Sequence, residues 1–245
     1  MKKILLAFLV IVTGAVSETV HAQNEKNLVY DANAQVRSVG SFTGIEVSGA
    51  IDLYLSQGGE DAVAVSASSD EIMNRIRTEV RGSVLHIYFD AKGLNWKSWG
   101  NHKMKAYVTF RKIDRVEASG ACNVKFTEKV KLDELWLEMS GASDLTGEVI
   151  TSKLRLDASG ASKMSLAGTA EKTNINASGA SEIKAYDLKI DYCKLDASGA
   201  SGIRITVNKE LSASASGGSS IYYKGTGLIR DISASGGATV KRRDD

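Results

Sequence analysis

The sequence predicts an all-β protein: a parallel, right-handed β-helix, or β-solenoid, with coils of about 19 residues. Seven Ser-Gly pairs, from Ser119 to Ser235, follow one another at spacings of 21, 19, 19, 20, 18 and 19 residues. Apolar and polar residues alternate on both sides of each pair, which indicates two strands that meet at a bend. The chain has no proline and 23 glycines, which fits many sharp corners between strands.

The first 22 residues read as a signal peptide that is removed before the protein folds. A basic start, Met1 to Lys3, precedes an apolar run over residues 4–16, and Ala22 ends a short cleavage motif. The alternative is a membrane anchor, but the run is shorter than the roughly 20 residues that span a bilayer. We therefore expect an exported protein of a Gram-negative cell, in the periplasm, on the outer surface or secreted, without a transmembrane segment after cleavage.

Cleavage after Ala22 leaves 223 residues with 29 basic and 28 acidic side chains. A net charge so close to zero argues against bulk electrostatic binding of nucleic acid or anionic lipid. The mature length is sufficient for one sizeable hydrophobic core.

Residues 23–110 are predicted to form an irregular N-terminal part of the same β-helix. Its expected elements are one coil over residues 42–55, strands at 62–66, 84–89 and 104–110, and one short helix over 69–77 with Ser69 or Asp70 as its N-cap. No linker-like stretch divides this part from the repeats. We therefore expect a single continuous domain over residues 36–240.

Residues 111–245 form the regular solenoid of Ser-Gly-Ala repeats, in which each repeat supplies one corner between strands. The best-preserved corners contain Ser119, Gly120, Ser140, Gly141, Ser159, Gly160, Ser178, Gly179, Ser198 and Gly199. Glycine supplies the backbone conformation that a sharp bend needs, and the serines can hydrogen-bond between coils. An open end of such a solenoid is an unpaired sheet edge, which the charged residues 241–245 are expected to protect.

The two cysteines are predicted to be free thiols. Cys122 follows a corner, at the position where the later repeats carry serine, and Cys193 lies on a strand four repeats later. Strands stack about 4.8 Å apart, so the two cysteines are roughly 19 Å apart along the axis. A disulfide needs Cα atoms within about 7 Å.

Two outward-facing columns of the repeats carry charge. Glu117, Glu138, Asp157, Asn176 and Asp196 stand two residues before the corner, and Arg115, Trp136, Arg155, Asn174 and Lys194 stand four before it. A ladder of carboxylates can bind calcium, but the adjacent basic column favours a solvated face with balanced charge. Trp136 is expected to stack on Arg155 of the next coil.

The segment over residues 94–102 is the candidate ligand site. Trp96 and Trp99 in a polar loop can form a platform for a sugar ring, with Asn101 and His102 as polar partners. The alternative is that the two indoles fold back and cover an end or a flank of the solenoid.

The sequence offers no catalytic constellation. The mature chain has two histidines, His86 and His102, and contains no Ser/His/Asp order, no metal-ligand cluster and no phosphate loop. We therefore predict no catalytic residues, no metal site and no cofactor.

Residues 36–55, followed by the Ser-Gly-Ala coils, carry a resemblance to a known family. Together they resemble the auto-transporter adhesin head domain family, also called the head GIN domain, over about residues 36–240. The resemblance implies a right-handed β-helix of Bacteroidetes type and carries over no catalytic residues.

Two functions follow as hypotheses. The first is a non-enzymatic surface or periplasmic module, adhesive or structural, whose partner is a cell-surface glycan or protein. The second is a glycan-binding or glycan-cleaving protein that uses the loop from Trp96 to His102. The oligomeric state is left open.

Overall fold

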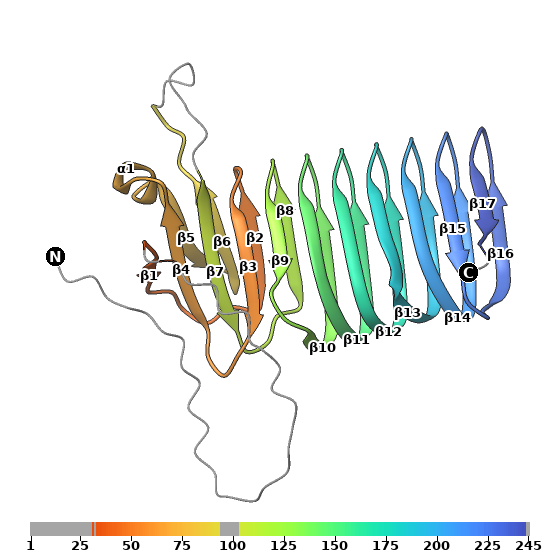
Figure 1. Cartoon of the computed structure of the whole chain (residues 1–245), viewed down its shortest axis with the longest axis horizontal. Helices are drawn as coiled ribbons and strands as arrows, with labels where there is room; N and C mark the ends of the chain where they lie inside the picture. Colours follow the sequence, from red (N-terminus) through yellow and green to blue (C-terminus); the bar gives the residue numbers. More distant parts are fainter. Residues whose placement is uncertain (1–30, 32, 94–102, 244–245) are drawn as a thin grey trace, which may run out of the picture.

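A computed structural model describes residues 31, 33–93 and 103–243 of the chain. The described residues form a 17-stranded sheet wound into an elongated solenoid, with one short helix at its N-terminal end (Figure 1). The predicted β-solenoid is therefore confirmed. In these ranges, no helix combines the length and the apolar character that a membrane span requires. The predicted signal peptide, residues 1–22, lies outside the described residues.

The regular coils follow from the repeat. Their strands are β8 (Arg115–Ser119), β9 (Asn123–Phe126), β10 (Val130–Met139), β11 (Asp144–Ala158), β12 (Lys163–Ala177), β13 (Glu182–Ala197), β14 (Gly202–Ala215), β15 (Ser220–Lys224), β16 (Leu228–Ala234) and β17 (Thr239–Arg242). Each of these strands up to β15 pairs in parallel with the strands of the coils before and after it, and β11 to β14 each run through almost a whole coil.

The core consists of columns of side chains that stack from coil to coil. One column contains Leu145, Met164, Ile183, Ile203 and Ile221, which are in register and fully buried. The alternation predicted on both sides of the corners is therefore present in the structure. Each coil buries its apolar face against its neighbours, so stability is approximately additive over adjacent coils.

The corner glycines lie in a left-handed backbone conformation and against one another. Gly141, Gly160, Gly179 and Gly199 have φ between +69° and +71°. The carbonyl of each of these glycines accepts a hydrogen bond of 2.7 or 2.8 Å from the amide of the residue that follows the glycine of the next coil, as from Ala161 to Gly141. A Cβ on Gly160 would lie 2.5 Å from the Gly141 oxygen, so only glycine fits there.

A second, buried serine column connects the coils from the inside. It is the residue after the corner alanine or glycine: Ser143, Ser162, Ser181, Ser201 and Ser219, each at most 1% exposed. The last four donate hydrogen bonds of 3.2 or 3.3 Å to carbonyl oxygens of the preceding coil. The serines of the pairs are partly or fully exposed; Ser140 donates to Ala118, which is an inter-coil bond as well.

Cys122 occupies the same buried column, one coil before Ser143, and its thiol lies 3.3 Å from the carbonyl oxygen of Ser119. Both cysteines are free and buried, as the repeat spacing predicts. Burial raises the pKa of the Cys193 thiol to about 12, and it also raises the pKa of Cys122. Because the thiolate is the reactive form, these cysteines are structural and chemically inert.

The N-terminal coils are stacked in an order that differs from the order of the chain. Their strands are β1 (Gln35–Arg37), β2 (Gly44–Ser48), β3 (Asp52–Gln57), β4 (Ala62–Ala67), β5 (Ile76–Arg81), β6 (Val84–Phe89) and β7 (Met104–Phe110). The coil of β2 and β3 lies between the coil of β6 and β7 and the coil of β8 and β9 (Figure 1). The coil of β2 and β3 comes first in the chain but lies inside the stack. The later strands up to β7 form the N-terminal end of the solenoid, and the chain then continues on the other side of the first coil with β8.

The predicted helix over residues 69–77 is too long. Helix α1 spans Asp70–Met73, with Ser69 as its N-cap, and the residues from Ile76 form strand β5. Ile76, Thr78 and Val80 are β-branched residues at alternate positions, which favours a strand. This strand pairs antiparallel with β6, and β4 pairs antiparallel with β1 and β7. The N-terminal end is thus closed by antiparallel strands rather than by further parallel coils alone.

A buried hydroxyl without a partner provides a test of the core. Thr173 is 2% exposed, stands in a column between Leu154 and Cys193, and its hydroxyl has no hydrogen-bond partner among the residues that the structure describes. Replacing Thr173 with valine removes the desolvation cost and is expected to raise the free energy of unfolding by about 1 kcal/mol. Urea unfolding followed by circular dichroism measures this change.

Thr151 is the matched control because it is also buried, at 6% exposed, but lies 3.0 Å from the carbonyl oxygens of Asp133 and Lys153. Thr151→Val should lower the free energy of unfolding by about 1 kcal/mol, since it removes a made hydrogen bond. Equal destabilisation by both substitutions would contradict this account of Thr173.

Candidate functional site

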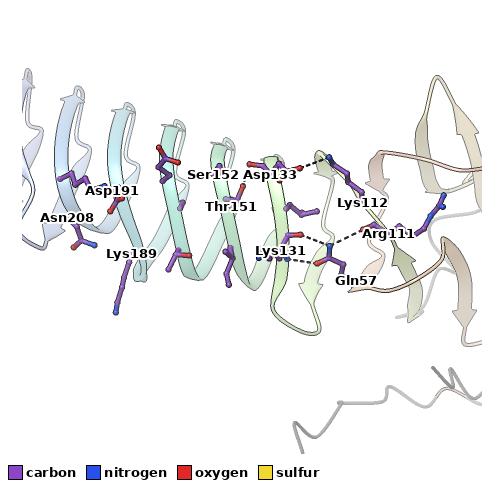
Figure 2. Close-up of a pocket in the computed structure, with 16 residues that line it drawn as sticks. Gln57, Arg111, Lys112, Lys131, Asp133, Thr151, Ser152, Lys189, Asp191 and Asn208 are labelled. Atoms are coloured by element: carbon purple, nitrogen blue, oxygen red, sulfur yellow. Dashed lines mark hydrogen bonds and ion pairs between the residues drawn. The ribbon is translucent and has the colours of Figure 1, made fainter. Parts of the chain in front are cut away.

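The sequence-predicted ligand site, Trp96, Trp99, Asn101 and His102, lies outside the described residues. The described part of the chain offers a different candidate, a groove of about 800 Å³ at the bend opposite the Ser-Gly corners. We call it the base groove. It runs along the solenoid axis, and Figure 2 shows its side chains in a row across successive coils, from Gln57 to Asn208.

The floor of the base groove follows from the register of the coils. Lys131, Ile150, Thr169 and Lys189 are aligned on consecutive strands β10, β11, β12 and β13. Coils stack about 4.8 Å apart, so the backbones of Lys131 and Lys189 are roughly 14 Å apart. The groove therefore presents a periodic surface with a cationic side chain on either side of a less polar centre.

Gln57 closes the N-terminal end of the groove. Its amide accepts a 2.8 Å hydrogen bond from the Lys131 N–H and donates a 2.9 Å bond to the Lys131 carbonyl, so it satisfies the backbone of β10 as a neighbouring strand would. Next to it, Arg111 forms a 3.2 Å ion pair with Asp61. These contacts hold the first strand of the groove in place and leave the Lys131 side chain exposed.

Ion pairs line the rim of the base groove. Lys112 pairs with Asp133 at 3.0 Å, and Lys209 pairs with Asp191 at 2.7 Å. In each pair, the hydrogen bond to the carboxylate raises the pKa of the lysine. Within the described ranges, the ammonium groups of Lys131 and Lys189 have no acidic partner within 4.0 Å. These two exposed cations are the groups in the groove that remain available to an anionic ligand.

The acidic column is balanced by its basic neighbours. Glu117, Glu138, Asp157, Asn176 and Asp196 are in register on consecutive coils, as predicted. Arg115 forms ion pairs with Glu117 and Glu138, and Arg155 pairs with Asp157 at 2.6 Å. Burial raises the pKa of Glu117, although Arg115 lies beside it. Among the described residues, no group of three or more potential ligands is placed to hold a metal ion.

Trp136 lies between two arginines on this face. The guanidinium carbon of Arg155 is 4.6 Å from the ring centroid, which confirms the predicted stacking, and that of Arg115 is 3.9 Å away. The indole N–H also donates a 2.6 Å hydrogen bond to Asp157. The guanidinium groups of both neighbouring coils contact the Trp136 ring. Trp136 therefore stabilises the stack of coils and is not available as a platform for a sugar.

His86 extends the acidic column toward the N-terminal end. It is in register with Glu46, and its Nδ1 lies 2.9 Å from a Glu46 carboxylate oxygen. A shallow hollow of about 230 Å³ surrounds the pair and includes Arg81 and Tyr88. The hydroxyl of Tyr88 donates to Glu79, so this cluster satisfies its own charges and hydrogen bonds.

The Ser-Gly repeat does not reveal the base groove, because the groove lies at the opposite bend of each coil. A signal was present, because Lys131 and Lys189 are separated by three repeats and occupy the same place in the repeat. Insertions at this bend change the spacing between equivalent residues of successive repeats, because the pairing of β13 with β14 shifts register between Ala185 and Lys189.

Comparisons with known proteins agree with this architecture. The family model described as "Putative auto-transporter adhesin, head GIN domain" matches residues 41–227. No curated protein matches the chain.

Solved structures show the same fold. A crystal structure of a putative adhesin from Bacteroides fragilis has 22% sequence identity and a TM-score of 0.79, over 86% of this chain and 96% of that one. A putative adhesin from Parabacteroides distasonis has 20% identity and a TM-score of 0.68, over 86% and 96%. A structure from the same species described as a putative lipid binding protein has 20% identity and a TM-score of 0.66, over 85% and 97%.

Proposed function

Because the chain belongs to the family of the putative auto-transporter adhesin head GIN domain, we propose that it is an exported, non-catalytic adhesive module. We propose further that it holds an extended anionic glycan in the base groove. The signal-like residues 1–22 support export. The observation that carries the binding site is the pair of unpartnered cations, Lys131 and Lys189, aligned along a groove of about 800 Å³.

The shape of the groove favours a linear polymer. A ligand that lies along the axis meets one coil after another at a spacing of about 4.8 Å, which is similar to the length of one sugar unit in an extended glycan. The hydroxyl group of Thr169 and the polar side chain of Asn208 line the same groove and offer hydrogen bonds. The ion pairs on the rim fix the orientation of Lys112 and Lys209 beside such a ligand.

Binding to a glycan array tests the proposal. Replacing both Lys131 and Lys189 with glutamate is expected to weaken binding to acidic glycans about tenfold or more, because two favourable charge contacts become repulsive. The matched control is Lys125→Glu with Lys184→Glu. These lysines are also exposed and three coils apart, but on another face.

The control variant carries the same change in net charge, so it should bind like the wild type. An equal loss in both variants would indicate non-specific attraction, and no loss in the groove variant would exclude the base groove. Release of reducing sugar ends from a bound glycan would contradict the non-catalytic role. Binding of an acidic peptide and of no glycan would replace the glycan with a protein partner.

The loop of Trp96 and Trp99 remains a second candidate site from the sequence. Trp96→Ala combined with Trp99→Ala, measured on the same array, distinguishes it from the groove. If the loop is the sugar platform, this variant loses binding at unchanged melting temperature, whereas the lysine variant does not.

A further inference from the structure

The C-terminal end of the solenoid presents an uncovered strand. In the described part of the chain, β16 pairs with β14, and no further strand lies on its outer side. Every residue of β16 is exposed, and its large apolar side chains are strongly so: Leu228 is 67%, Ile229 45% and Ile232 38% exposed.

These side chains continue the core columns. Ile229 is in register with Leu211, which is 1% exposed, and Ile232 is in register with Ala213, which is 4% exposed. In each earlier coil such a position is covered by the coil that follows. In β16 none of the described residues covers it, so within that part of the chain the end of the hydrophobic core reaches the solvent.

The N-terminal end is different, because it is covered. Helix α1 and the antiparallel strands β4 and β5 close it (Figure 1), and Ile72 and Met73 of the helix are only 4% and 2% exposed. A solenoid needs such a polar outer cap at both ends to avoid association. The chain thus has one capped end and one end that is open.

Residues 241–245 are expected to protect the open end. Residues 241–243, the part of this segment that the structure describes, do not cover β16. Arg242 donates a 2.7 Å hydrogen bond to the Gly225 carbonyl, and the guanidinium of Arg243 lies 4.5 Å from the Tyr222 ring centroid. Both side chains turn back onto the preceding coil. They lie beside β17 and do not cover the outer edge of β16.

We propose that a second copy of this chain covers the open end, with the two β16 strands paired antiparallel about a two-fold axis. The sequence of β16 is self-complementary in this arrangement. Two polar residues, Arg230 and Asp231, stand between the inward-facing Ile229 and Ile232, because the pairing of β16 with β14 shifts register here and leaves Arg230 as an extra residue of β16. Within its own chain, Arg230 also forms an ion pair with Glu210. Centring the axis between Arg230 and Asp231 places each of these residues opposite its counterpart of opposite charge. The same register places Ile229 opposite Ile232 of the second copy.

Residues that are directly opposite in an antiparallel pair lie on the same face of the sheet. Both copies carry the same extra residue at Arg230, so the two isoleucines extend the core across the junction while Arg230 and Asp231 stay on the outside. The contact is isologous, so it closes at two copies and does not grow into a filament. The dimer carries two base grooves along one axis, which raises the avidity for a long polymer.

Sedimentation velocity of the mature chain over a wide concentration range tests the dimer. The wild type is expected to dimerise, and Leu228→Lys and Ile229→Lys are each expected to raise the dimer dissociation constant about tenfold or more. Leu228 is so exposed that its substitution leaves folding intact, which circular dichroism verifies. The control is Val36→Lys, at a residue that is 54% exposed on β1 at the other end and should leave the dimer unchanged.

Disulfide trapping tests the register. A mixture of Ile229→Cys protein and Ile232→Cys protein should form a disulfide-linked dimer on oxidation, whereas neither variant alone should, because the two native thiols are buried. A monomeric wild type, species larger than a dimer, or an equal effect of Val36→Lys would overturn the proposal. These outcomes are independent of glycan binding.

Discussion

Replacing Gly160 with alanine is expected to lower the free energy of unfolding by about 3 kcal/mol or more, through backbone strain and overpacking together. Gly160 has φ +71°, a conformation that costs any residue with a Cβ, and the new Cβ would lie 2.5 Å from the Gly141 carbonyl oxygen. Neither coil can move freely, because the Gly141 oxygen accepts the 2.7 Å hydrogen bond from Ala161. Urea and thermal unfolding followed by circular dichroism measure the loss.

Gly202→Ala is the control for this substitution. Gly202 begins β14 in a neighbouring part of the solenoid, its φ is not positive, and an added Cβ would meet nothing within 4 Å. Its replacement should change stability by less than about 1 kcal/mol and can be stabilising. A similar loss for Gly160→Ala and Gly202→Ala would show that the corner glycines are not required by the stacking.

The second large effect is expected at Phe110. This residue ends β7 and is fully buried, as are Met104, Ala106 and Val108 at alternate positions of the strand, at 4% exposed or less. Phe110→Ala should lower the free energy of unfolding by about 3–5 kcal/mol, because it removes a large apolar side chain and leaves a cavity. Chemical denaturation measures this loss from the denaturant concentration at the midpoint of unfolding and from the slope of the free energy against denaturant concentration.

Tyr192→Ala provides the comparison, since Tyr192 is an aromatic residue on β13 that is 36% exposed. Its truncation removes a contact with the Lys209 ammonium, 5.3 Å from the ring centroid, and should cost less than about 1 kcal/mol. If the two truncations cost the same, the core is not centred on the inward columns as described.

The regular repeats were predictable because each coil packs the same inward-facing positions against its neighbours. The period, the inward columns and the free cysteines all follow from the spacing of the Ser-Gly pairs. Both serines of each Ser-Gly-Ala-Ser corner are visible in the sequence, but the sequence does not show which of the two columns is buried. Alternation predicts which residues of a strand face inward, but it does not apply through a corner, where the left-handed glycine turns the chain.

The N-terminal part was predictable in its elements and not in their arrangement. Residues 42–55 form a coil, as expected, but its place between β6 and β8 depends on pairing between distant segments. The helix was overestimated because Ile76 to Arg81 have an antiparallel partner in β6 that local propensity does not reveal. Tertiary pairing therefore decided the boundary between Met73 and Ile76.

The candidate site shows the same division. The stacked β-solenoid is already encoded in the residue pattern, because a repeated alternation of apolar residues permits one core and repeated glycines permit one kind of corner. Only the tertiary structure brought Gln57, Lys131 and Lys189 into one groove, and only it showed that Ile229 and Ile232 end the core uncovered. A column or a groove is made of residues from successive coils. These residues are about 19 positions apart in the chain and about 4.8 Å apart in space, so their contact depends on how the coils stack.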